Sequence, residues 1–458
     1  MELSAIAKSL GHDIDCPEAS IKKFVIDSRQ VVDNSCFFAI TGEKCDGHSF
    51  IEEALNAGAH LAIGTKRGIN NQAHNYICVE NIHHAMFKIA AYKRKLSKAK
   101  VVAVIGNVGK TTTKEYLKSI LSDRYFVSAT KGNQNGLIGV PLTILNTPAK
   151  CEALVLEIGI DQVGDMKALS SLARPDDALV TSLGSEHLLK LKDEATAVAE
   201  ELLLCEDVLK RGGQCFLPMW NHWAKSFAED HVKTYGKKLI AIWLDEYKHI
   251  WGAKNIHFKY NQEKNYLKLE GKATHYHLPQ PGYHNAKNFA LASSYTHEKW
   301  AILPSVHMEF STPDGRTQVC NGINGSRLIL DYYNAQEDSV LSALELLKEE
   351  SKRLNKPSIC ILGDLLDLGE HEKRIHQRVA NRISSLSIET VLLCGPRMKS
   401  FVFPLLEPLY KRNNLLWFAE SKQIEQGLSH LAAEAVILLK GSRAMHMENV
   451  VPFLSRKL

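Results

Sequence analysis

The feature that most constrains this chain is a glycine-rich turn between a predicted buried strand and a predicted helix. The strand is the continuous apolar run VVAVIG (Val101 to Gly106), and the helical pattern KTTTKEYLKSIL begins at Lys110. A run that is apolar at every position is typical of a strand buried on both faces of a parallel sheet. Such a strand, followed closely by a helix, favours an α/β fold.

The residues of this turn suit phosphate binding. Glycines let the backbone close around phosphate oxygens, and free N–H groups at a helix start attract anions. Lys110 supplies a positive charge, which we expect on a surface loop, and Thr111 offers its hydroxyl to Mg²⁺. We therefore expect a nucleoside triphosphate site built from Gly106, Asn107, Val108, Gly109, Lys110, Thr111 and Thr112.

The spacing of the turn differs from that of the general P-loop, which has four residues between its glycines. Here only Asn107 and Val108 separate the two glycines. An ordinary strand-to-helix turn is the competing interpretation. The flanking strand and helix, together with the GKTTT run, favour the phosphate site.

The chain is long enough for several domains. At roughly 100 to 200 residues per domain, its 458 residues predict three. We expect these three parts to be residues 1–98, 99–308 and 309–458, with the glycine-rich turn in the second. The basic stretch KRKLSKAK (Lys93 to Lys100) is the predicted linker between the first two.

Short apolar runs at helix-length intervals predict the fold class. They include FVIDSR and CFFAITG in the first part, ALVLEIG and ALVTSLG in the second, and LILDYYNA, SICILGDL, ETVLLCG and AVILLKGS in the third. Strands that alternate with helices predict doubly wound sheets. We expect three α/β domains, with a central doubly wound, mostly parallel-sheet ATP-binding domain and a C-terminal Rossmann-like domain.

Charge and composition argue against several other classes of protein. The 56 basic and 51 acidic residues give a net charge of +5, and the two signs are mixed along the chain. This pattern is not that of a nucleic-acid binder, and no run approaches the roughly 20 apolar residues of a membrane span. The 10 cysteines form no CxxC pair. We expect no nucleic-acid partner, no stable membrane insertion, and a cytoplasmic protein with reduced thiols.

Two further candidates follow neighbouring predicted strands. Glu157 lies near the end of ALVLEIG, and His187 comes soon after ALVTSLG. Ligands gather at the carboxyl ends of parallel strands, so this carboxylate and this imidazole can converge on Mg²⁺ beside the phosphates. Taken singly, a helix-start acid and a core histidine are the simpler interpretations.

Taken together, these segments resemble the Mur ligase family of ATP-dependent amide-forming enzymes. The turn from Ile105 to Thr112 resembles the family's short loop TGxxGKT[ST], with isoleucine where threonine is usual. The resemblance covers nearly the whole chain. Its other segments follow in the family's order: IDSRQVVDNSCFFAITGEKCDGHSF, KGNQNGLIGVPLTIL, PGYHNAKNFALA, DGRTQV, LILDYYNAQEDSV, ICILGDLLDLGEHEKRIH and LLKGSRAMHMENVV.

The resemblance implies a specific reaction. Its DSR, TGE, DGH and LGDLLDLGE segments favour the member that joins D-alanyl-D-alanine to UDP-N-acetylmuramoyl-tripeptide in peptidoglycan synthesis. It implies ATP and Mg²⁺ as cofactors and an acyl-phosphate intermediate. It also implies that residues 1–98 bind the uridine nucleotide, that 99–308 bind ATP, and that 309–458 bind the incoming dipeptide and close on ATP. We expect a monomer.

The resemblance also assigns residues to roles. Lys110, Glu157 and His187 are the expected catalytic residues, and Thr111, Glu157 and His187 the expected metal ligands. Asn285 and Asn288 match residues near the adenine, while Arg316 and Asp331 match residues that reach ATP on closure. Asn133 and Asn135 are expected substrate contacts beside the reacting phosphate and the muramoyl side. The expected residues of the uridine-nucleotide pocket are Ser28, Arg29, Thr41, Gly42, Glu43, Asp46 and His48. For Ser28 and Asp46 the competing interpretation is a cap of a turn or helix.

Three departures from the family pattern lie in the central part. The usual lysine, carbamylated in most members, falls near Leu202, and we hypothesise that Glu200 or Glu201 supplies the missing negative charge at a second cation site. Ser182 replaces a common asparagine, and PMWNHW replaces an NADD-like segment. A sister ligase that adds a different amino acid and a non-catalytic ATP-binding paralogue stay open as alternatives, with a nucleic-acid-stimulated ATPase a remote third.

Overall fold

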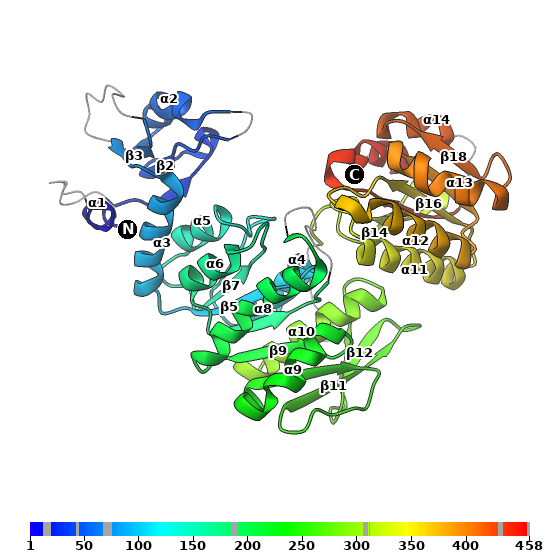
Figure 1. Ribbon diagram of the computed structural model, residues 1–458, viewed down its shortest axis with the longest axis horizontal. Coiled ribbons are helices and arrows are strands. Elements are labelled where there is room, and N and C mark those ends of the chain that lie inside the picture. The colour runs from blue at the N-terminus through cyan, green and yellow to red at the C-terminus, as the bar shows by residue number, and fades with distance from the viewer. Residues whose placement is uncertain are drawn as a thin grey trace.

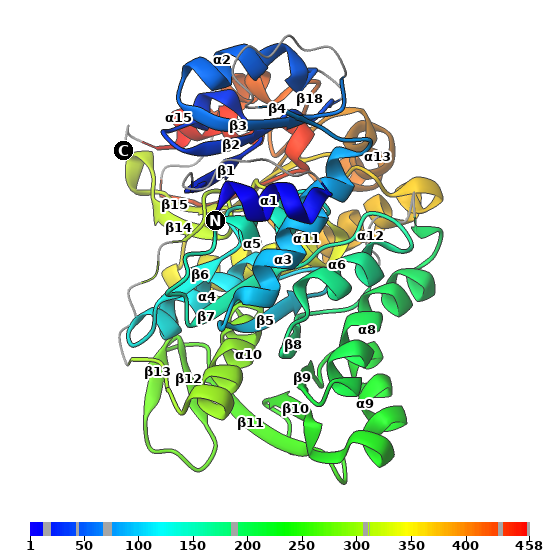
Figure 2. The ribbon, with the colours of Figure 1, turned by 90° about the vertical axis from the view of Figure 1, so that its left-hand side faces the viewer.

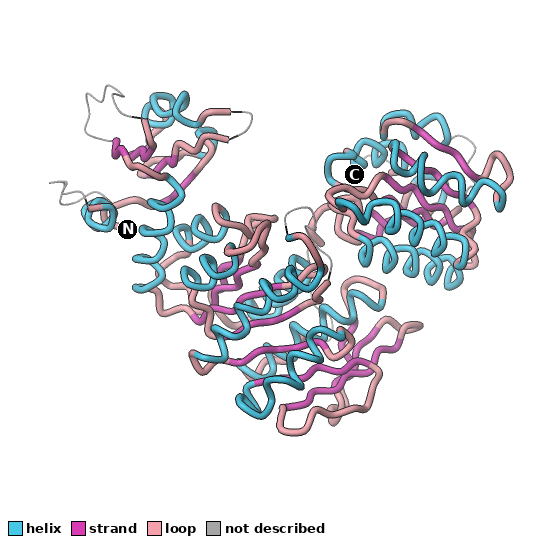
Figure 3. The backbone as a smooth tube through the Cα atoms, viewed as in Figure 1, coloured by secondary structure: helices cyan, strands magenta, loops and turns pink. Residues whose placement is uncertain are grey.

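The computed structural model describes residues 1–11, 20–42, 45–66, 76–184, 191–305, 310, 312–428 and 434–455. Within these residues the strands gather into three separate sheets of four, nine and six strands (Figures 1 and 3). Most neighbouring strands are parallel, and helices pack on the sheets. The predicted three-part α/β fold with mostly parallel sheets is therefore confirmed.

The first sheet has the order β1-β2-β3-β4, with every pair parallel. Its strands are β1 Lys23–Val25, β2 Ser35–Phe38, β3 Ala59–Gly64 and β4 Tyr76–Cys78, and its helices are α1 Leu3–Leu10, α2 Ile51–Asn56 and α3 Ile82–Leu96. The predicted linker is wrong in its first half, because α3 continues to Leu96 and packs beside α5 and α6 of the central part (Figure 2). Basic side chains favour the last turn of a helix, where its dipole is negative.

The central sheet has the order β13-β12-β11-β10-β9-β8-β5-β7-β6 within the described residues. It is parallel from β6 to β11, and β12 and β13 add an antiparallel edge. The register pairs Val104 of β5 with Glu157 of β7, and Ile105 with Val180 of β8, so these three strands end together. The strand bounds are β5 Lys100–Ile105, β6 Val127–Ala129, β7 Ala153–Glu157, β8 Asp177–Val180, β9 Gln214–Pro218, β10 Leu239–Leu244, β11 Lys254–Asn261, β12 Tyr266–Leu269 and β13 His275–His277.

Both faces of the central sheet are covered, which explains why its strands are apolar at every position. On one face α4 and α10 pack through Tyr116 and Phe289, whose rings meet edge to face at 5.1 Å. The other face carries α5, α6, α8 and α9 together with α3. The helix bounds are α4 Lys110–Ser122, α5 Gly139–Asn146, α6 Asp165–Ala173, α8 Glu194–Lys210, α9 His222–Tyr235 and α10 Tyr283–Trp300.

The third sheet has the order β14-β15-β19-β16-β17-β18, and only the β14–β15 pair is antiparallel among the described strands. Its strands are β14 Gln318–Asn321, β15 Arg327–Leu330, β16 Ser358–Gly363, β17 Thr390–Cys394, β18 Leu415–Phe418 and β19 Val436–Lys440. Its helices are α11 Glu337–Leu354, α12 Glu372–Ser385, α13 Phe403–Leu406, α14 Glu425–Leu428 and α15 Val451–Leu454. Among the helices described here, none has both the length and the apolar character needed to cross a bilayer.

Candidate active site

The glycine-rich turn, hereafter the P-loop (residues 106–111), connects the end of β5 to the first turn of α4. Gly106 and Gly109 have φ angles of +117° and +93°, which side chains of L-residues rarely adopt. A Cβ at Gly106 would lie 2.3 Å from the carbonyl oxygen of Ser182, and one at Gly109 would lie 2.3 Å from Oδ1 of Asn288. Only glycine therefore allows the loop to pack this closely against β8 and α10.

Ser182, two residues after the end of β8, holds the P-loop in place. The backbone N–H of Asn107 donates to the Ser182 carbonyl at 2.8 Å. The Ser182 hydroxyl accepts from the N–H of Val108 at 2.9 Å and donates to the Val108 carbonyl at 3.1 Å. The serine that departs from the family pattern is thus a direct partner of the loop.

Lys110 is not the exposed charge that the sequence predicted. Its side chain is buried, and its ammonium donates to the carbonyls of Gly106 and, at 3.2 Å, of Asn107. The loop folds around the lysine, so backbone carbonyls replace water around the charge. This arrangement keeps the ammonium at the centre of the loop, where phosphate oxygens would bind.

Glu157 lies beside Thr111, at the end of the neighbouring strand β7. Its Oε1 accepts from the Thr111 hydroxyl at 3.0 Å and from the Asn135 amide at 2.9 Å. Oε2 is buried without a hydrogen bond, and the ammonium of Lys114 lies 3.5 Å from it. His187 lies outside the described residues.

This donor set fits Mg²⁺. A hydroxyl and a carboxylate are the oxygen ligands that Mg²⁺ prefers, and the ion usually keeps several waters and needs only one or two carboxylates. The buried Oε2 of Glu157 has the unused acceptor capacity that such an ion would take up. Thr111 and Glu157 can therefore hold Mg²⁺ next to the P-loop.

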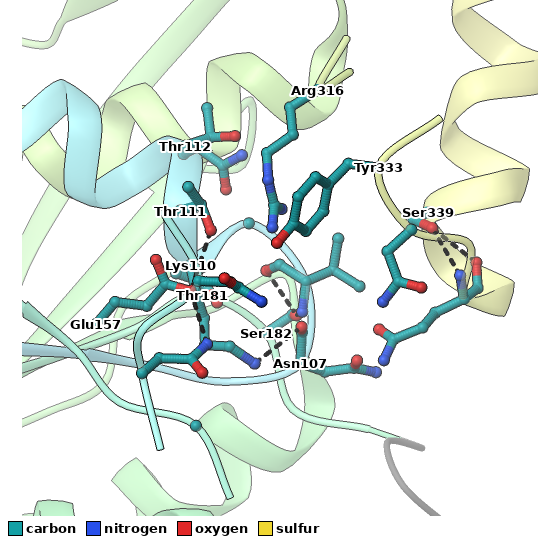
Figure 4. Close-up of a pocket in the computed structure, with 18 of the residues that line it drawn as sticks. Asn107, Lys110, Thr111, Thr112, Glu157, Thr181, Ser182, Arg316, Tyr333 and Ser339 are labelled. Atoms are coloured by element: carbon teal, nitrogen blue, oxygen red, sulfur yellow. Dashed lines mark hydrogen bonds between the residues drawn. The ribbon is translucent and has the colours of Figure 1, made fainter. Parts of the chain in front are cut away.

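Residues of the central and third parts, with Ile26 and His83 of the first part, line one cavity of about 1130 Å³. In Figure 4 Arg316 and Tyr333 extend side by side toward the P-loop, and the Arg316 guanidinium lies 4.2 Å from the Tyr333 ring centre. Across from them, α10 contributes Asn285 and Asn288 at its first turns. The cavity brings together the predicted residues Asn107, Val108, Gly109, Lys110, Thr111, Thr112, Asn133, Asn135, Glu157, Asn285, Asn288, Arg316 and Asp331.

Asp331 is held by residues that the sequence analysis did not single out. Its carboxylate accepts from the Thr317 N–H at 2.9 Å and from the buried ammonium of Lys440 at 2.5 Å. Lys440 is the last residue of β19, directly before Gly441. Its position at a strand end could have marked it as a candidate site residue. Lys114 was also missed, although it lies one turn after Thr111 on the same face of α4.

His284 occupies the contact between α10 and the third part. Its Nε2 lies 3.4 Å from the Thr317 hydroxyl. Burial lowers the pKa of His284 to about 4, with Lys440 and Lys287 lowering it further and Asp331 opposing them. The imidazole is therefore neutral at physiological pH.

Burial likewise lowers the pKa of Lys287, and it raises the pKa of Asp338 on α11.

Glu200 and Glu201 both have backbone partners. Oε1 of Glu200 accepts from the N–H groups of Gly164 at 2.8 Å and Met166 at 3.0 Å, at the start of α6. Oε2 of Glu201 accepts from the Gly106 N–H at 3.2 Å, beneath the P-loop. Neither lines the cavity among its described residues. This geometry favours structural roles for both glutamates over the hypothesised second cation site.

The candidate uridine-nucleotide residues lie in the first part of the chain and do not line the described wall of this cavity. Asp46 accepts from the Thr41 hydroxyl at 3.1 Å, from the Lys66 ammonium at 2.5 Å, and from the His48 ring at 2.7 Å. The bond from Lys66, with those from His48, holds the pKa of Asp46 well below its usual range. The structure thus brings Thr41, Asp46 and His48 together.

The other predicted residues of the uridine-nucleotide pocket do not take part in this hydrogen-bond network. Arg29 is exposed and pairs with Asp27 at 2.8 Å. Asp27, not Ser28, caps the short helix that starts at Ser28, since its side chain accepts from the Arg29 N–H. Gly42 follows Thr41 in the same loop, and Glu43 lies outside the described residues.

Three family models match consecutive parts of the chain. "Mur ligase family, catalytic domain" matches residues 20–106, "Mur ligase middle domain" residues 104–295, and "Mur ligase, glutamate ligase domain" residues 315–443.

Individual proteins match along most of their length. The UDP-N-acetylmuramoyl-tripeptide–D-alanyl-D-alanine ligase of Bacillus subtilis is 29% identical, with 93% of this chain and 91% of that protein covered. The enzyme of the same name from Synechocystis is 30% identical, with 81% and 79% covered. The crystal structure of MurF ligase from Thermotoga maritima in complex with ADP matches with a TM-score of 0.74 and 24% identity, over 94% of this chain and 96% of that one.

Proposed function

This chain belongs to the Mur ligase family, and we propose that it joins D-alanyl-D-alanine to UDP-N-acetylmuramoyl-tripeptide at the expense of ATP. Two relatives that it matches over most of their length carry this activity in their names. The product would serve peptidoglycan synthesis. The observation that carries the proposal is that Lys110 and Glu157 share one cavity with Arg316.

We assign the nucleotide to the P-loop side of this cavity. Lys110 and the loop N–H groups would bind the β and γ phosphates, with Asn285 and Asn288 toward the base. Thr111 and Glu157 would hold Mg²⁺, which when bound neutralises phosphate charge. The MurF ligase of Thermotoga maritima was crystallised in complex with ADP, which supports an adenine nucleotide as ligand of this chain.

The reaction that fits these groups has two steps. A substrate carboxylate oxygen forms a bond to the γ-phosphorus of ATP, and the bond to the ADP oxygen breaks. The amine of D-alanyl-D-alanine then attacks the acyl carbon, the amide forms, and phosphate leaves with loss of one proton from the amine.

The chain's own residues act by charge and position. The first step brings an anion against a polyanion, so the buried Lys110 ammonium stabilises the charge that develops there. Asn135, fixed by its bond to Glu157, faces the same space. Arg316 and Asp331 would approach the nucleotide from the third part and exclude water from the acyl phosphate.

We propose that residues 1–98, 99–308 and 309–458 act as separate domains that bind the uridine nucleotide, ATP and the dipeptide. The network of Thr41, Asp46 and His48 supports an ordered polar site in the first of them. A cytoplasmic location is part of the proposal. The free thiols of the nine described cysteines, which include the exposed Cys45, are consistent with a reducing compartment.

An amine-specificity assay tests the proposal against its alternatives. Phosphate release is measured with ATP, Mg²⁺ and UDP-N-acetylmuramoyl-tripeptide, with D-alanyl-D-alanine or with single amino acids. We expect release that depends on the dipeptide. Preference for a single amino acid would identify a sister ligase, and nucleotide binding without any release would identify a non-catalytic paralogue.

A further inference from the structure

A second cavity, hereafter the basic cavity, lies at the opposite edge of the central sheet from the P-loop. It measures about 1060 Å³ and is bounded by the first residues of β5 and β8, by the turn between α8 and β9, and by the ends of α3, α6 and α10. The six-residue strand β5 begins at Lys100 in the basic cavity and ends next to Gly106. At about 3.3 Å per residue, roughly 20 Å separate the two sites.

Cations dominate the described lining of the basic cavity. Six basic residues face two carboxylates, which leaves a surplus of four positive charges within a chain whose net charge is +5. The basic residues are Arg94, Lys95, Lys100, Arg174, Arg211 and Lys299, and the carboxylates are Asp176 and Asp177.

Both carboxylates already have partners. Asp177 accepts from the Lys299 ammonium at 2.9 Å and from the Gln214 N–H at 3.0 Å. Asp176 accepts from the Val101 N–H at 2.7 Å and lies 3.8 Å from the Arg94 guanidinium. Neither has the capacity to neutralise the remaining cations.

Helix ends account for only part of the surplus. Arg94 donates to the Ala173 carbonyl at 2.8 Å, and Arg211 donates to the Pro175 carbonyl at 3.2 Å, so both arginines cap backbone at the end of α6. A helix C-terminus carries about half a negative charge, so four of them offset about two of the four surplus charges. About two positive charges of the lining are therefore offset neither by a carboxylate of the lining nor by a helix end.

Several of the surplus cations are on exposed side chains. Lys95, Arg174 and Arg211 are exposed. Arg174 has φ +43° at the cap of α6, a conformation that glycine or asparagine adopts at lower cost. Burial, together with the charges of Arg174 and Arg211, lowers the pKa of Arg94 despite the nearby Asp176. A bound anion would offset the repulsion that Arg174 and Arg211 add to the effect of burial.

We propose that the basic cavity binds a small molecule carrying a diphosphate or a comparable pair of phosphate groups. Two or more negative charges match the remaining surplus, and guanidinium groups bind phosphate oxygens in pairs. The described lining has no aromatic ring, so it provides no stacking platform for a nucleobase. The proposal is independent of the ligase reaction, because the basic cavity and the P-loop cavity share no described lining residue.

Inorganic pyrophosphate is the probe that tests this site. Binding to the full chain is measured by isothermal titration calorimetry, with saturating ADP present so that the P-loop cavity is occupied. The test variant is Lys95→Ala/Arg174→Ala, and the matched control is Lys411→Ala/Arg412→Ala, which removes the same charge from an exposed loop of the third part.

We expect pyrophosphate to bind in the presence of ADP, the test variant to bind at least tenfold more weakly, and the control to bind as the unmodified chain does. The test variant should keep its ligase rate and melting temperature. Equal weakening in both variants, or loss of pyrophosphate binding when ADP is added, would overturn the site. Tighter binding of heparin than of pyrophosphate at the same residues would overturn the small-molecule assignment.

Discussion

Gly109→Ala tests the close packing between the P-loop and α10. At φ +93° an L-residue costs roughly 1 to 2 kcal/mol. The new Cβ would also lie 2.3 Å from Asn288 Oδ1, so the side chain or the loop must move by about 1 Å to reach ordinary contact. A displacement of this size at a reacting geometry lowers turnover by about a hundredfold.

Gly164→Ala is the matched control for Gly109→Ala. Gly164 has φ +97°, but nothing lies within 4 Å of its ideal Cβ, so this substitution adds backbone strain without a clash. Both variants should lose unfolding free energy in urea titrations, and Gly109→Ala should lose more because the clash adds to the backbone strain. Only Gly109→Ala should lose turnover and affinity for ADP, measured by phosphate release and calorimetry.

A double variant tests whether Asn288 transmits the effect. Replacing Asn288 by Ala removes the clashing atom, so Gly109→Ala should have a smaller effect on ADP affinity in the Asn288→Ala background than in the unmodified chain. Additive losses, or equal activity in Gly109→Ala and Gly164→Ala, would refute the packing argument.

Three other variants test the site. Lys110→Ala should lower kcat by about 10²- to 10³-fold. The variant should still unfold in a cooperative transition, because the lysine hydrogen-bonds to loop carbonyls rather than filling the core. A near-normal rate would contradict the phosphate role of Lys110. Glu157→Gln should raise the Mg²⁺ concentration for half-maximal phosphate release by about tenfold or more, and an unchanged requirement would mean that the acid binds no metal. His284 should make the protein less stable as pH falls from about 6.5 to 4, by up to roughly 3 kcal/mol, because only the unfolded chain takes up its proton in that window. Urea unfolding at pH 5 and 7 should show a smaller difference in His284→Gln, and an identical difference would rule the histidine out.

Strand periodicity predicted much of the fold. The runs VVAVIG, ALVLEIG and ALVTSLG became β5, β7 and β8, since residues buried on both faces of a parallel sheet are apolar at every position. The antiparallel strands β12 and β13 were not predicted. They lie at the edge of the sheet and include Lys268, His275 and His277, so they lack that apolar signal.

Side-chain positions were harder to predict than strand ends. The pairing of Val104 with Glu157 follows from parallel register, so the approach of Glu157 to Thr111 was predictable. The burial of Lys110 was not, because it depends on loop carbonyls that turn inward. The partners of Glu200 and Glu201 depend on tertiary packing of α8 against α6 and the P-loop, which no local pattern encodes.

The most direct test of the central claim is the mass of the reaction product. The chain is incubated with ATP, Mg²⁺, UDP-N-acetylmuramoyl-tripeptide and D-alanyl-D-alanine, and the products are analysed by mass spectrometry beside the same reaction with Lys110→Ala. We predict a product heavier than the tripeptide substrate by one dipeptide less one water, formed one for one with ADP and, at equal reaction times, strongly reduced with the variant. ADP formed without this product, or the product formed equally by Lys110→Ala, would contradict the account.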